Sequence, residues 1–474
     1  MRLFNEVPPL PANFAIRHGL GDTLLASVKE ALESSGLCFV HGEGGMGKTV
    51  TTCAFLRTNE ELGDLFPDGA AFVTVGQSPH VLNLQAALLR SLGCTMPLLD
   101  TAEGYARLHE TLAGKRCLVV LDDVWDVRQL EMFTSVHSRP KTWRGVVFLC
   151  TTRLPDLTPG NASAQLVRLG ELTDAEVAQL LGNNIDEDAL VQLARLCARS
   201  PLALSILGAA KRLDLSSTDW ANICKDLEAA DASKGNVVKQ CIALASQNLD
   251  IKTRDLYLRL AVFPDDVLLP VEALKTIFAE EDVYPALRGL SERHLLRIER
   301  GEDDVERVRL HDLSLEYVKE CFANAFPDGE RRLHEALLDR YRAKLKADGQ
   351  WWSGPNDGYF FENLLNHLVQ AGQVPEARAL VLTWDWLAAR MSHARDVVAL
   401  ITDVYTLAPP GAFKSSQAVV TELSNEIAKK AAPAAAGSKP KGKAKPSISG
   451  PKAKAAGGFA AGSPAGPQGA ARPT

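Results

Sequence analysis

The chain has 474 residues, of which 46% are hydrophobic and 23% are charged, and its formal net charge is −6. This composition is typical of a water-soluble globular protein, and the length exceeds what one hydrophobic core normally supports, so we expect about three domains plus tails. No apolar run approaches the roughly eighteen residues of a membrane span, and the N-terminus lacks the pattern of a secretion signal. These features predict a cytoplasmic protein with no membrane partner.

The nine cysteines are scattered singly along the chain. They show no C-x-x-C spacing and no Cys/His spacing of the kind that binds zinc. We therefore expect buried thiols in a reducing compartment, and neither disulfides nor a zinc site.

The first motif follows a proline-rich, extended segment (residues 7–14) and a predicted helix (residues 22–34). Leu37 to Val40 form an apolar run that predicts a strand, and residues 51–56 predict a helix. Between them, residues 42–49 fit the pattern G-x-x-x-x-G-K-[ST], which binds phosphates through backbone N–H groups at the start of a helix. The predicted binding residues are Gly42, Gly44, Gly45, Met46, Gly47, Lys48 and Thr49.

Within this loop, two side chains have specific expected roles. Lys48 would reach the β- and γ-phosphates of a nucleotide, and Thr49 would hold Mg²⁺. A glycine-rich turn that binds nothing is the alternative, but the strand and helix on either side favour the phosphate-binding interpretation.

A second motif ends a continuous apolar run, Cys117 to Leu121, of the kind found in strands buried on both faces of a parallel sheet. The run is followed by Asp122 and Asp123. We predict that Asp122 completes the Mg²⁺ site with Thr49, and that Asp123 orients or deprotonates the attacking water. Lys48 and Asp123 are thus the candidate catalytic residues, and a solvated acidic loop is the alternative.

Further strand-like runs at residues 70–75, 146–150 and 166–169 alternate with helical patterns such as residues 82–92. This alternation predicts a doubly wound parallel sheet, in which ligands bind at the carboxyl ends of the strands. Arg153 directly follows the fourth strand. Its permanent charge suits a sensor of the γ-phosphate, whereas an ordinary surface arginine is the alternative.

Beyond residue 170 the pattern becomes helical. Residues 173–176 fit a T-x-x-E capping box that starts a helix through residue 181, and helices are expected at residues 187–198 and 202–213, interrupted by Ser200-Pro201. Between residues 237 and 322, short helices precede two strand-like runs, 296–300 and 305–310, which predict a hairpin and a winged-helix domain. The helices of this domain lack a clear Lys/Arg stripe, so nucleic acid is not an expected partner.

The order of these motifs resembles the NB-ARC family of signal-transduction ATPases with numerous domains, the group that contains apoptotic protease-activating factors and plant disease-resistance proteins. The resemblance spans residues 5–322 and rests on six motifs that occur in the family's order. They are residues 42–49 with Val50, 118–125 (LVVLDDVW), 151–153 (TTR), 200–203 (SPLA), 258–266 (LRLAVFPDD) and 310–312 (LHD).

The resemblance implies further nucleotide contacts. It strengthens the sensor role of Arg153, places Pro201 near the adenine, and brings His311 of the winged-helix domain to the β-phosphate of ADP. The segment with Phe14, Ile16 and Arg17 looks like the adenine-side clasp of the family, and Val50 extends the phosphate loop.

Two departures from the family pattern stand close to these motifs. Arg199-Ser200 precedes Pro201 where the family usually has Gly-Leu, and Leu310 stands where it usually has Met. The Met-to-Leu change conserves volume and should be tolerated. For Arg199 two outcomes are open: a changed nucleotide affinity, or a side chain that points to solvent.

Residues 351–390 resemble the helical linker that joins NB-ARC modules to WD40 propellers or helical repeats, and their aromatic residues are expected to pack helix against helix. We find no propeller repeat, leucine-rich repeat or death-fold segment. Residues 429–474 contain nine Lys/Arg and no acidic residue, whereas the remainder has 43 basic and 58 acidic residues. We expect this basic tail to be disordered and solvated; contact with nucleic acid, anionic lipid or an acidic partner is the alternative.

The predicted fold class is α/β: a P-loop NTPase doubly wound parallel sheet, then a helical domain, a winged-helix domain and a short helical region. The expected boundaries are 1–20 for the extended segment, 21–170, 171–235, 236–325 and 326–428 for the four folded parts, and 429–474 for the tail. The predicted function is an ADP/ATP-binding, Mg²⁺-dependent switch that controls signalling by domain rearrangement and self-association, with slow ATP hydrolysis and a protein partner as sensor or effector. A winged-helix transcription regulator, a housekeeping ATPase and a decoy form are the alternatives.

Overall fold

The computed structural model describes residues 2–407 with gaps, the longest of which are 158–163, 182–186, 213–224, 229–236 and 395–399. The chain divides into two compact units, residues 1–426 and 427–474. The predicted basic tail lies outside the described residues, so everything below concerns the first unit.

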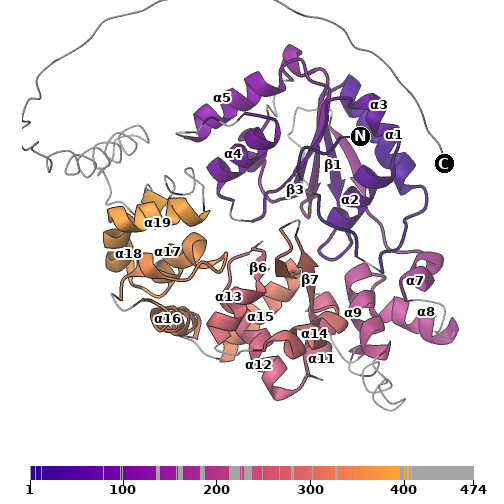
Figure 1. Cartoon of the computed structure of the whole chain (residues 1–474). Helices are drawn as coiled ribbons and strands as arrows, with labels where there is room; N and C mark the ends of the chain where they lie inside the picture. Colours follow the sequence, from indigo (N-terminus) through magenta and orange to yellow (C-terminus); the bar gives the residue numbers. More distant parts are fainter. Residues whose placement is uncertain are drawn as a thin grey trace, which may run out of the picture. The chain divides into compact units, whose positions relative to one another are not determined.

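A five-stranded parallel sheet forms the N-terminal part (Figure 1). Its strands are β1 (Leu37–His41), β2 (Gly69–Thr74), β3 (Cys117–Val124), β4 (Val146–Thr152) and β5 (Gln165–Arg168), in the spatial order β2-β3-β4-β1-β5. The chain therefore crosses the sheet between neighbours that are distant in sequence, and the predicted doubly wound sheet is confirmed. Four of the five strands begin and end within two residues of their predicted positions, and β3 runs three residues further at its carboxyl end.

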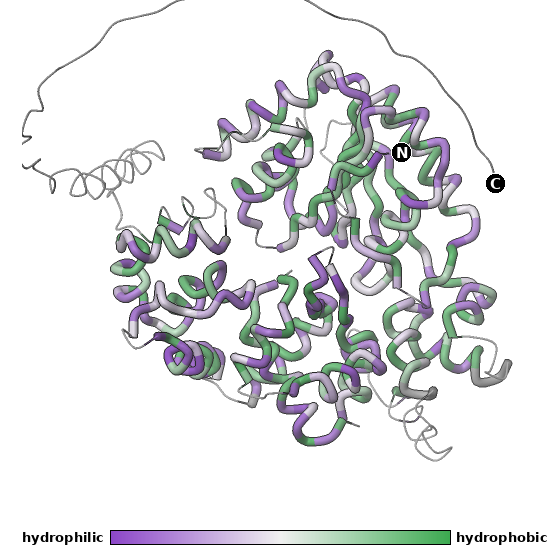
Figure 2. Tube along the Cα trace, viewed as in Figure 1, coloured by the Kyte–Doolittle hydropathy of each residue, from purple (hydrophilic) through white to green (hydrophobic). Residues whose placement is uncertain are grey.

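Helices cover both faces of this sheet because alternate strand residues point in opposite directions. One face packs against α1 (Leu20–Glu33), α2 (Lys48–Thr58) and α3 (Leu62–Leu65); the other packs against α4 (Val81–Ser91), α5 (Thr101–Leu112) and α6 (Val127–Glu131). In β1, Cys38 and Val40 join the first cluster, whereas Leu37 and Phe39 join the second. The strands are accordingly hydrophobic over most of their length (Figure 2).

The next part is helical. It contains α7 (Asp174–Leu181), α8 (Glu187–Leu196) and α9 (Pro201–Arg212). The capping box that starts α7 forms in both directions, since Thr173 N–H donates to Glu176 Oε2 (2.9 Å) and Glu176 N–H donates to Thr173 Oγ1 (3.3 Å). Pro201 is the first residue of α9, where its missing N–H has no intrahelical partner to lose.

A three-stranded antiparallel sheet and its helices follow. The elements are α11 (Val237–Gln247), α12 (Ile251–Arg259), β6 (Leu269–Pro270), α13 (Val271–Phe278), α14 (Tyr284–Glu292), β7 (Leu296–Arg300), β8 (Glu306–Leu310) and α15 (Asp312–Ala325). β7 and β8 form the predicted hairpin, with Leu296 opposite Leu310 and Arg300 opposite Glu306. The two-residue strand β6, which pairs with β8, is too short to have a sequence pattern of its own.

The C-terminal helices are α16 (Gly329–Arg342), α17 (Phe360–Gln370), α18 (Val374–Val381) and α19 (Trp384–Ala394). Their aromatic residues pack helix against helix, as expected: the ring of Trp386, which is fully buried, lies 5.6 Å from that of Phe361 and 6.2 Å from that of Phe360.

The described part of the chain bears on the state of the cysteines and on membrane-spanning helices. Eight cysteines fall within it; all are free and six are buried. Among the described helices, none has both the length and the apolar character needed to cross a lipid bilayer.

One arginine completes the C-terminal end of α1. The three nitrogens of the Arg139 guanidinium donate to six backbone carbonyls, those of Ala31, Leu32, Ser34, Trp143, Arg144 and Val146. Carbonyls at a helix end lack intrahelical partners, and a cation there also interacts favourably with the helix dipole. Arg139 thus joins α1 to the start of β4.

We expect Arg139→Ala to lower the free energy of unfolding by about 2–3 kcal/mol, because it removes charge-assisted hydrogen bonds from several carbonyls at once. Urea denaturation of the variant beside Arg144→Ala, which removes a neighbouring exposed arginine, measures this. Equal stabilities of the two variants would contradict the assigned role.

A buried histidine pair joins α16 to α17. His334 Nδ1 lies 2.7 Å from His367 Nδ1, and His367 Nε2 lies 2.7 Å from the hydroxyl of Tyr359. Burial lowers the pKa of His334 to about 4 and that of His367 to about 3. Both rings are therefore neutral in the folded protein at neutral pH.

Because an unfolded histidine titrates near pH 6.5, this pair contributes its full stability above that pH and loses it as the pH falls toward 4. We expect the free energy of unfolding to fall by about 1.4 kcal/mol per pH unit for each histidine in this window. Denaturation of the wild type and of His334→Gln/His367→Gln between pH 7 and 5 tests this; an equally steep pH dependence in both proteins would refute it.

Candidate functional site

The glycine-rich loop lies between β1 and α2, as predicted. Gly45 and Gly47 have φ angles of 81° and 83°, a region that side-chain-bearing residues rarely adopt. Lys48, the first residue of α2, donates from Nζ to the carbonyls of Gly42 (2.8 Å) and Glu43 (3.0 Å). Burial lowers the pKa of Lys48 to about 8, with a further contribution from nearby Arg153.

The second motif meets the loop at the end of β3. The hydroxyl of Thr49 donates to both carboxylate oxygens of Asp122 (2.9 and 3.0 Å), and the hydroxyl of Thr151 donates to Asp122 Oδ1 (2.7 Å). Asp122 is 3% exposed, and burial raises its pKa to about 6. A hydroxyl and a carboxylate in contact are the oxygen ligands that Mg²⁺ prefers, so Thr49 and Asp122 fit the predicted metal site.

Asp123 adopts an unusual backbone conformation. Its φ is 57°, and the pairing of β3 with β4 shifts register between Leu121 and Val124. Its N–H donates to Thr151 Oγ1 (2.8 Å), and its carboxylate accepts a hydrogen bond from Trp125 Nε1 (2.8 Å). Burial raises the pKa of Asp123. The carboxylate is therefore held in a fixed position at the edge of the loop.

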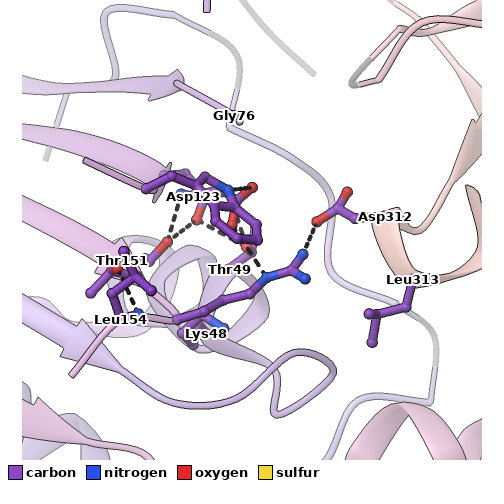
Figure 3. A network of polar contacts seen from close by, with 12 residues as sticks. Lys48, Thr49, Gly76, Asp123, Thr151, Leu154, Asp312 and Leu313 are labelled. Carbon is purple, nitrogen blue, oxygen red and sulfur yellow. Dashed lines mark hydrogen bonds and ion pairs between the residues drawn. The ribbon is translucent and has the colours of Figure 1, made fainter. Parts of the chain in front are cut away.

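Arg153 contacts carboxylates from two separate parts of the chain. It lies 2.8 Å from Asp312 Oδ2 on α15 and 3.6 Å from Asp123 Oδ1 (Figure 3). It also lies 3.3 Å from Glu316 Oε1 on α15. Its guanidinium also stands over the ring of Trp125, 4.9 Å from the centroid. Its side chain is only 14% exposed. The arginine predicted as a γ-phosphate sensor thus joins the edge of the parallel sheet to α15.

Residues from later helices cover the loop. The carbonyl of Gly45 accepts hydrogen bonds from Ser200 Oγ and from Leu202 N–H, both at 3.3 Å. A Cβ added at Gly45 would lie 3.1 Å from Val238 of α11, and one at Gly44 would lie 3.2 Å from Leu313 of α15. The glycines therefore permit this close approach of helices to the loop as well as its curvature.

Two neighbouring cavities adjoin the loop. The larger, about 980 Å³, is lined by the charged and phosphate-loop residues, including Gly44, Gly45, Gly47, Lys48, Thr49, Asp122, Asp123, Arg153 and His311. The smaller, about 90 Å³, is lined by the residues predicted for the adenine side, including Phe14, Arg17, Met46, Val50, Pro201 and His311. Together they are large enough for a nucleotide.

Not every predicted residue lines these cavities. Ile16 is 55% exposed and lines neither of them. Gly42 lines neither cavity either, and its carbonyl accepts a hydrogen bond from Lys48. Arg17 lines the smaller cavity and also supports the loop, because its guanidinium donates to the carbonyls of Met46 (2.9 Å) and Gly170 (2.6 Å).

His311 lines both cavities and has a defined tautomer. Its Nδ1 accepts a hydrogen bond from Leu313 N–H (3.2 Å). Its pKa is lowered to about 4, mainly by burial and also by the nearby cations Arg153, Arg297 and Lys48, against the opposing effect of Asp312. The ring is therefore neutral at neutral pH, with its proton on Nε2, which can donate to a ligand.

The structure explains how the first of the two departures is accommodated. Arg199 has a φ of 50°, the left-handed region in which glycine is favoured. Its guanidinium binds Asp174 (2.7 Å) and the carbonyl of Leu172 (3.0 Å), and it lines neither cavity. Leu310 lines the larger cavity.

Some site residues were missed from the sequence. Asp312 was noted only as part of a motif, and Glu316 and Arg297 were not noted at all. No local signal marks Glu316, which meets Arg153 only after α15 packs against the loop. Arg297 belongs to a predicted strand, and only the tertiary structure brings that strand to the cavities.

Comparison with known proteins matches two family models to this chain. The NB-ARC domain matches residues 22–188, and the APAF-1 helical domain matches residues 331–422. The second match covers the helices that were compared with a linker in the sequence.

Similar proteins extend these matches over most of the chain. Apoptotic protease-activating factor 1 from Homo sapiens is 24% identical over 411 residues, 81% of this chain and 32% of the relative. Disease resistance protein ADR1 from Arabidopsis thaliana is 26% identical over 293 residues, 59% of this chain and 33% of the relative. The chain thus spans about a third of the length of these two relatives.

A solved structure shares the fold. It is the signal transduction ATPase with numerous domains with a tetratricopeptide repeat sensor from Pyrococcus horikoshii, with a TM-score of 0.54 and 16% identity, covering 84% of this chain and 55% of that one. Given these matches and the loop geometry, residues 22–188 form an NB-ARC domain with the P-loop NTPase fold, and most of the chain is similar to signal-transduction ATPases of the apoptotic protease-activating factor and plant disease-resistance type.

Proposed function

We propose that this chain is an ADP/ATP switch in which the bound nucleotide determines whether the sheet and α15 stay together. The observation that carries the proposal is the position of Arg153. It stands in the phosphate-loop cavity, yet its partners Asp312 and Glu316 belong to the helix that directly follows His311.

With ADP bound, the contacts on both sides of the nucleotide favour a closed state. The loop and Lys48 would bind the phosphates, Phe14 and Pro201 would flank the adenine, and His311 Nε2–H would donate to the β-phosphate. Arg153 keeps its partners on α15, since no γ-phosphate competes for it. The inferred winged-helix domain, residues 236–325, is thereby held against the loop.

ATP would change this balance by adding negative charge beside Arg153. The γ-phosphate offers the guanidinium a new partner and repels Asp312 and Glu316, so its binding favours an arrangement in which α15 is released. The surfaces freed in this way would support self-association and binding of a protein that acts as sensor or effector.

Slow hydrolysis would return the switch to the ADP state. Mg²⁺, held by Thr49 and Asp122, would shield the phosphate charge. Asp123, fixed by Trp125 and Thr151, would orient or deprotonate a water.

We expect Lys48→Ala to abolish binding of Mg·ADP, because the variant loses the one cation on the loop itself. Isothermal titration calorimetry measures this, with Lys29→Ala as the control: Lys29 lies on α1, is 44% exposed and pairs with Glu61. Wild-type affinity in Lys48→Ala would refute the site.

We expect His311→Ala to release ADP about ten-fold faster or more, since a hydrogen bond to a phosphate is lost, and to shift the protein toward oligomers. The rate is measured by displacement of a fluorescent ADP, and the size by gel filtration. His80→Ala, at an exposed position that precedes α4, is the control.

Unchanged ADP release and unchanged size in His311→Ala would contradict the closed-state model. Rapid multiple-turnover ATP hydrolysis by a wild-type protein that retains no ADP would instead favour a housekeeping ATPase.

A further inference from the structure

We propose that Arg297, on strand β7, binds the phosphate chain of the nucleotide as a contact additional to the loop and to His311. The inference rests on the proposed nucleotide-binding function. It gives the hairpin a permanently charged side chain that binds phosphate, beside the neutral histidine.

The position of Arg297 is the first reason. It lines both cavities, as His311 does, so it stands where the phosphate side and the adenine side of the site meet. The hairpin register fixes it there, because Arg297 lies opposite Arg309 in the β7–β8 pairing. A residue on a paired strand is held more rigidly than one on a loop.

The second reason is that no side chain bonds directly to its charge, and Glu299 on the same strand acts on it only from a distance. The other cations that line the cavities have partners: carbonyls for Lys48 and Arg17, and carboxylates for Arg153, Arg300, Arg307 and Arg309. In the part of the chain that the structure describes, the side chain of Arg297 forms no hydrogen bond and no ion pair within 4.0 Å. Its side chain is solvent-accessible, which leaves its donors available to a ligand.

The third reason is the balance of charge around His311. Burial lowers the pKa of this histidine, and Arg153, Arg297 and Lys48 also lower it against the opposing effect of Asp312, so the ring donates only a neutral hydrogen bond to an anion. A guanidinium offers several N–H donors in a planar fork and stays charged at any physiological pH. A nucleoside diphosphate, with oxygens that accept such paired hydrogen bonds, is the ligand that this cluster of cations fits.

A consequence concerns the switch. Arg297 precedes the hairpin turn and His311 follows it, so the nucleotide would be bound by both ends of one rigid unit. Removal of either contact weakens the attachment of the hairpin to the nucleotide, but only the Arg297 contact depends strongly on ionic strength.

The test compares Arg297→Gln, Arg297→Lys and a control, Arg288→Gln, in the full chain. Arg288 lies on the adjacent helix α14, is exposed and lines neither cavity, so its change removes the same charge nearby. Affinities for Mg·ADP and for adenosine are measured by titration calorimetry at low and high salt, after thermal melting without nucleotide has shown that each variant folds.

We expect Arg297→Gln to bind Mg·ADP about 10- to 100-fold more weakly, with a shallower salt dependence, while its affinity for adenosine is unchanged. Arg297→Lys should lose less, because it keeps the charge but not the fork, and Arg288→Gln should match the wild type.

Unchanged affinity for ADP in Arg297→Gln overturns the proposal, and so does an equal loss for ADP and adenosine, which would indicate contact with the base. If Lys48→Ala loses binding while Arg297→Gln keeps it, only this inference fails. If the wild type binds no ADP, the proposed function fails with it. Should Arg297→Gln not fold, Arg297→Lys with wild-type affinity and wild-type salt dependence overturns the proposal.

Discussion

The guanidinium of Arg153 is almost enclosed, and its charge must be balanced by whatever lies beside it. In this structure the balance comes from Asp123 on the sheet and from Asp312 and Glu316 on α15. An enclosed cation that loses its partners is costly, so the position of α15 depends on whether another anion is present. Because His311 immediately precedes α15, a single ion-pair exchange would move the histidine and the helix together.

Burial shifts the pKa of two further groups at the site, Lys48 and Asp122. The pKa of Lys48 is lowered to about 8 and that of Asp122 is raised to about 6, so the protein environment opposes the charged form of both. Bound phosphate favours the ammonium, and a divalent cation favours the carboxylate. In the proposed switch, metal and nucleotide would each relieve a different electrostatic cost, which gives a physical reason for them to bind together.

Much of the fold could be predicted from the sequence, because the strands carry strong local signals. β1, β3 and β4 consist mostly of continuous apolar runs, and the capping box of α7 can be recognised from four consecutive residues. By contrast, α5 was missed because few of its residues are apolar, and β6 because two residues have no periodicity. The loop and Asp122 were predictable from spacing. The sequence did not predict the contacts of Arg153 with Asp312 and Glu316 or the position of Arg297, because these depend on how distant elements pack. Ile16, predicted by resemblance alone, lies exposed outside both cavities.

Arg199 shows that a motif residue can matter for the backbone conformation and yet make no contact with the nucleotide cavities. The residue occupies a left-handed backbone conformation, and its side chain turns toward Asp174, away from the nucleotide cavities. Glycine at such a position avoids a steric cost of about 1 kcal/mol, so its replacement by arginine changes the folding free energy of the helical part more than the chemistry of the site. We therefore expect a motif residue whose original role is to permit a backbone turn to be replaceable without loss of ligand recognition, so that sequence searches which require the glycine would overlook chains that have kept the pocket.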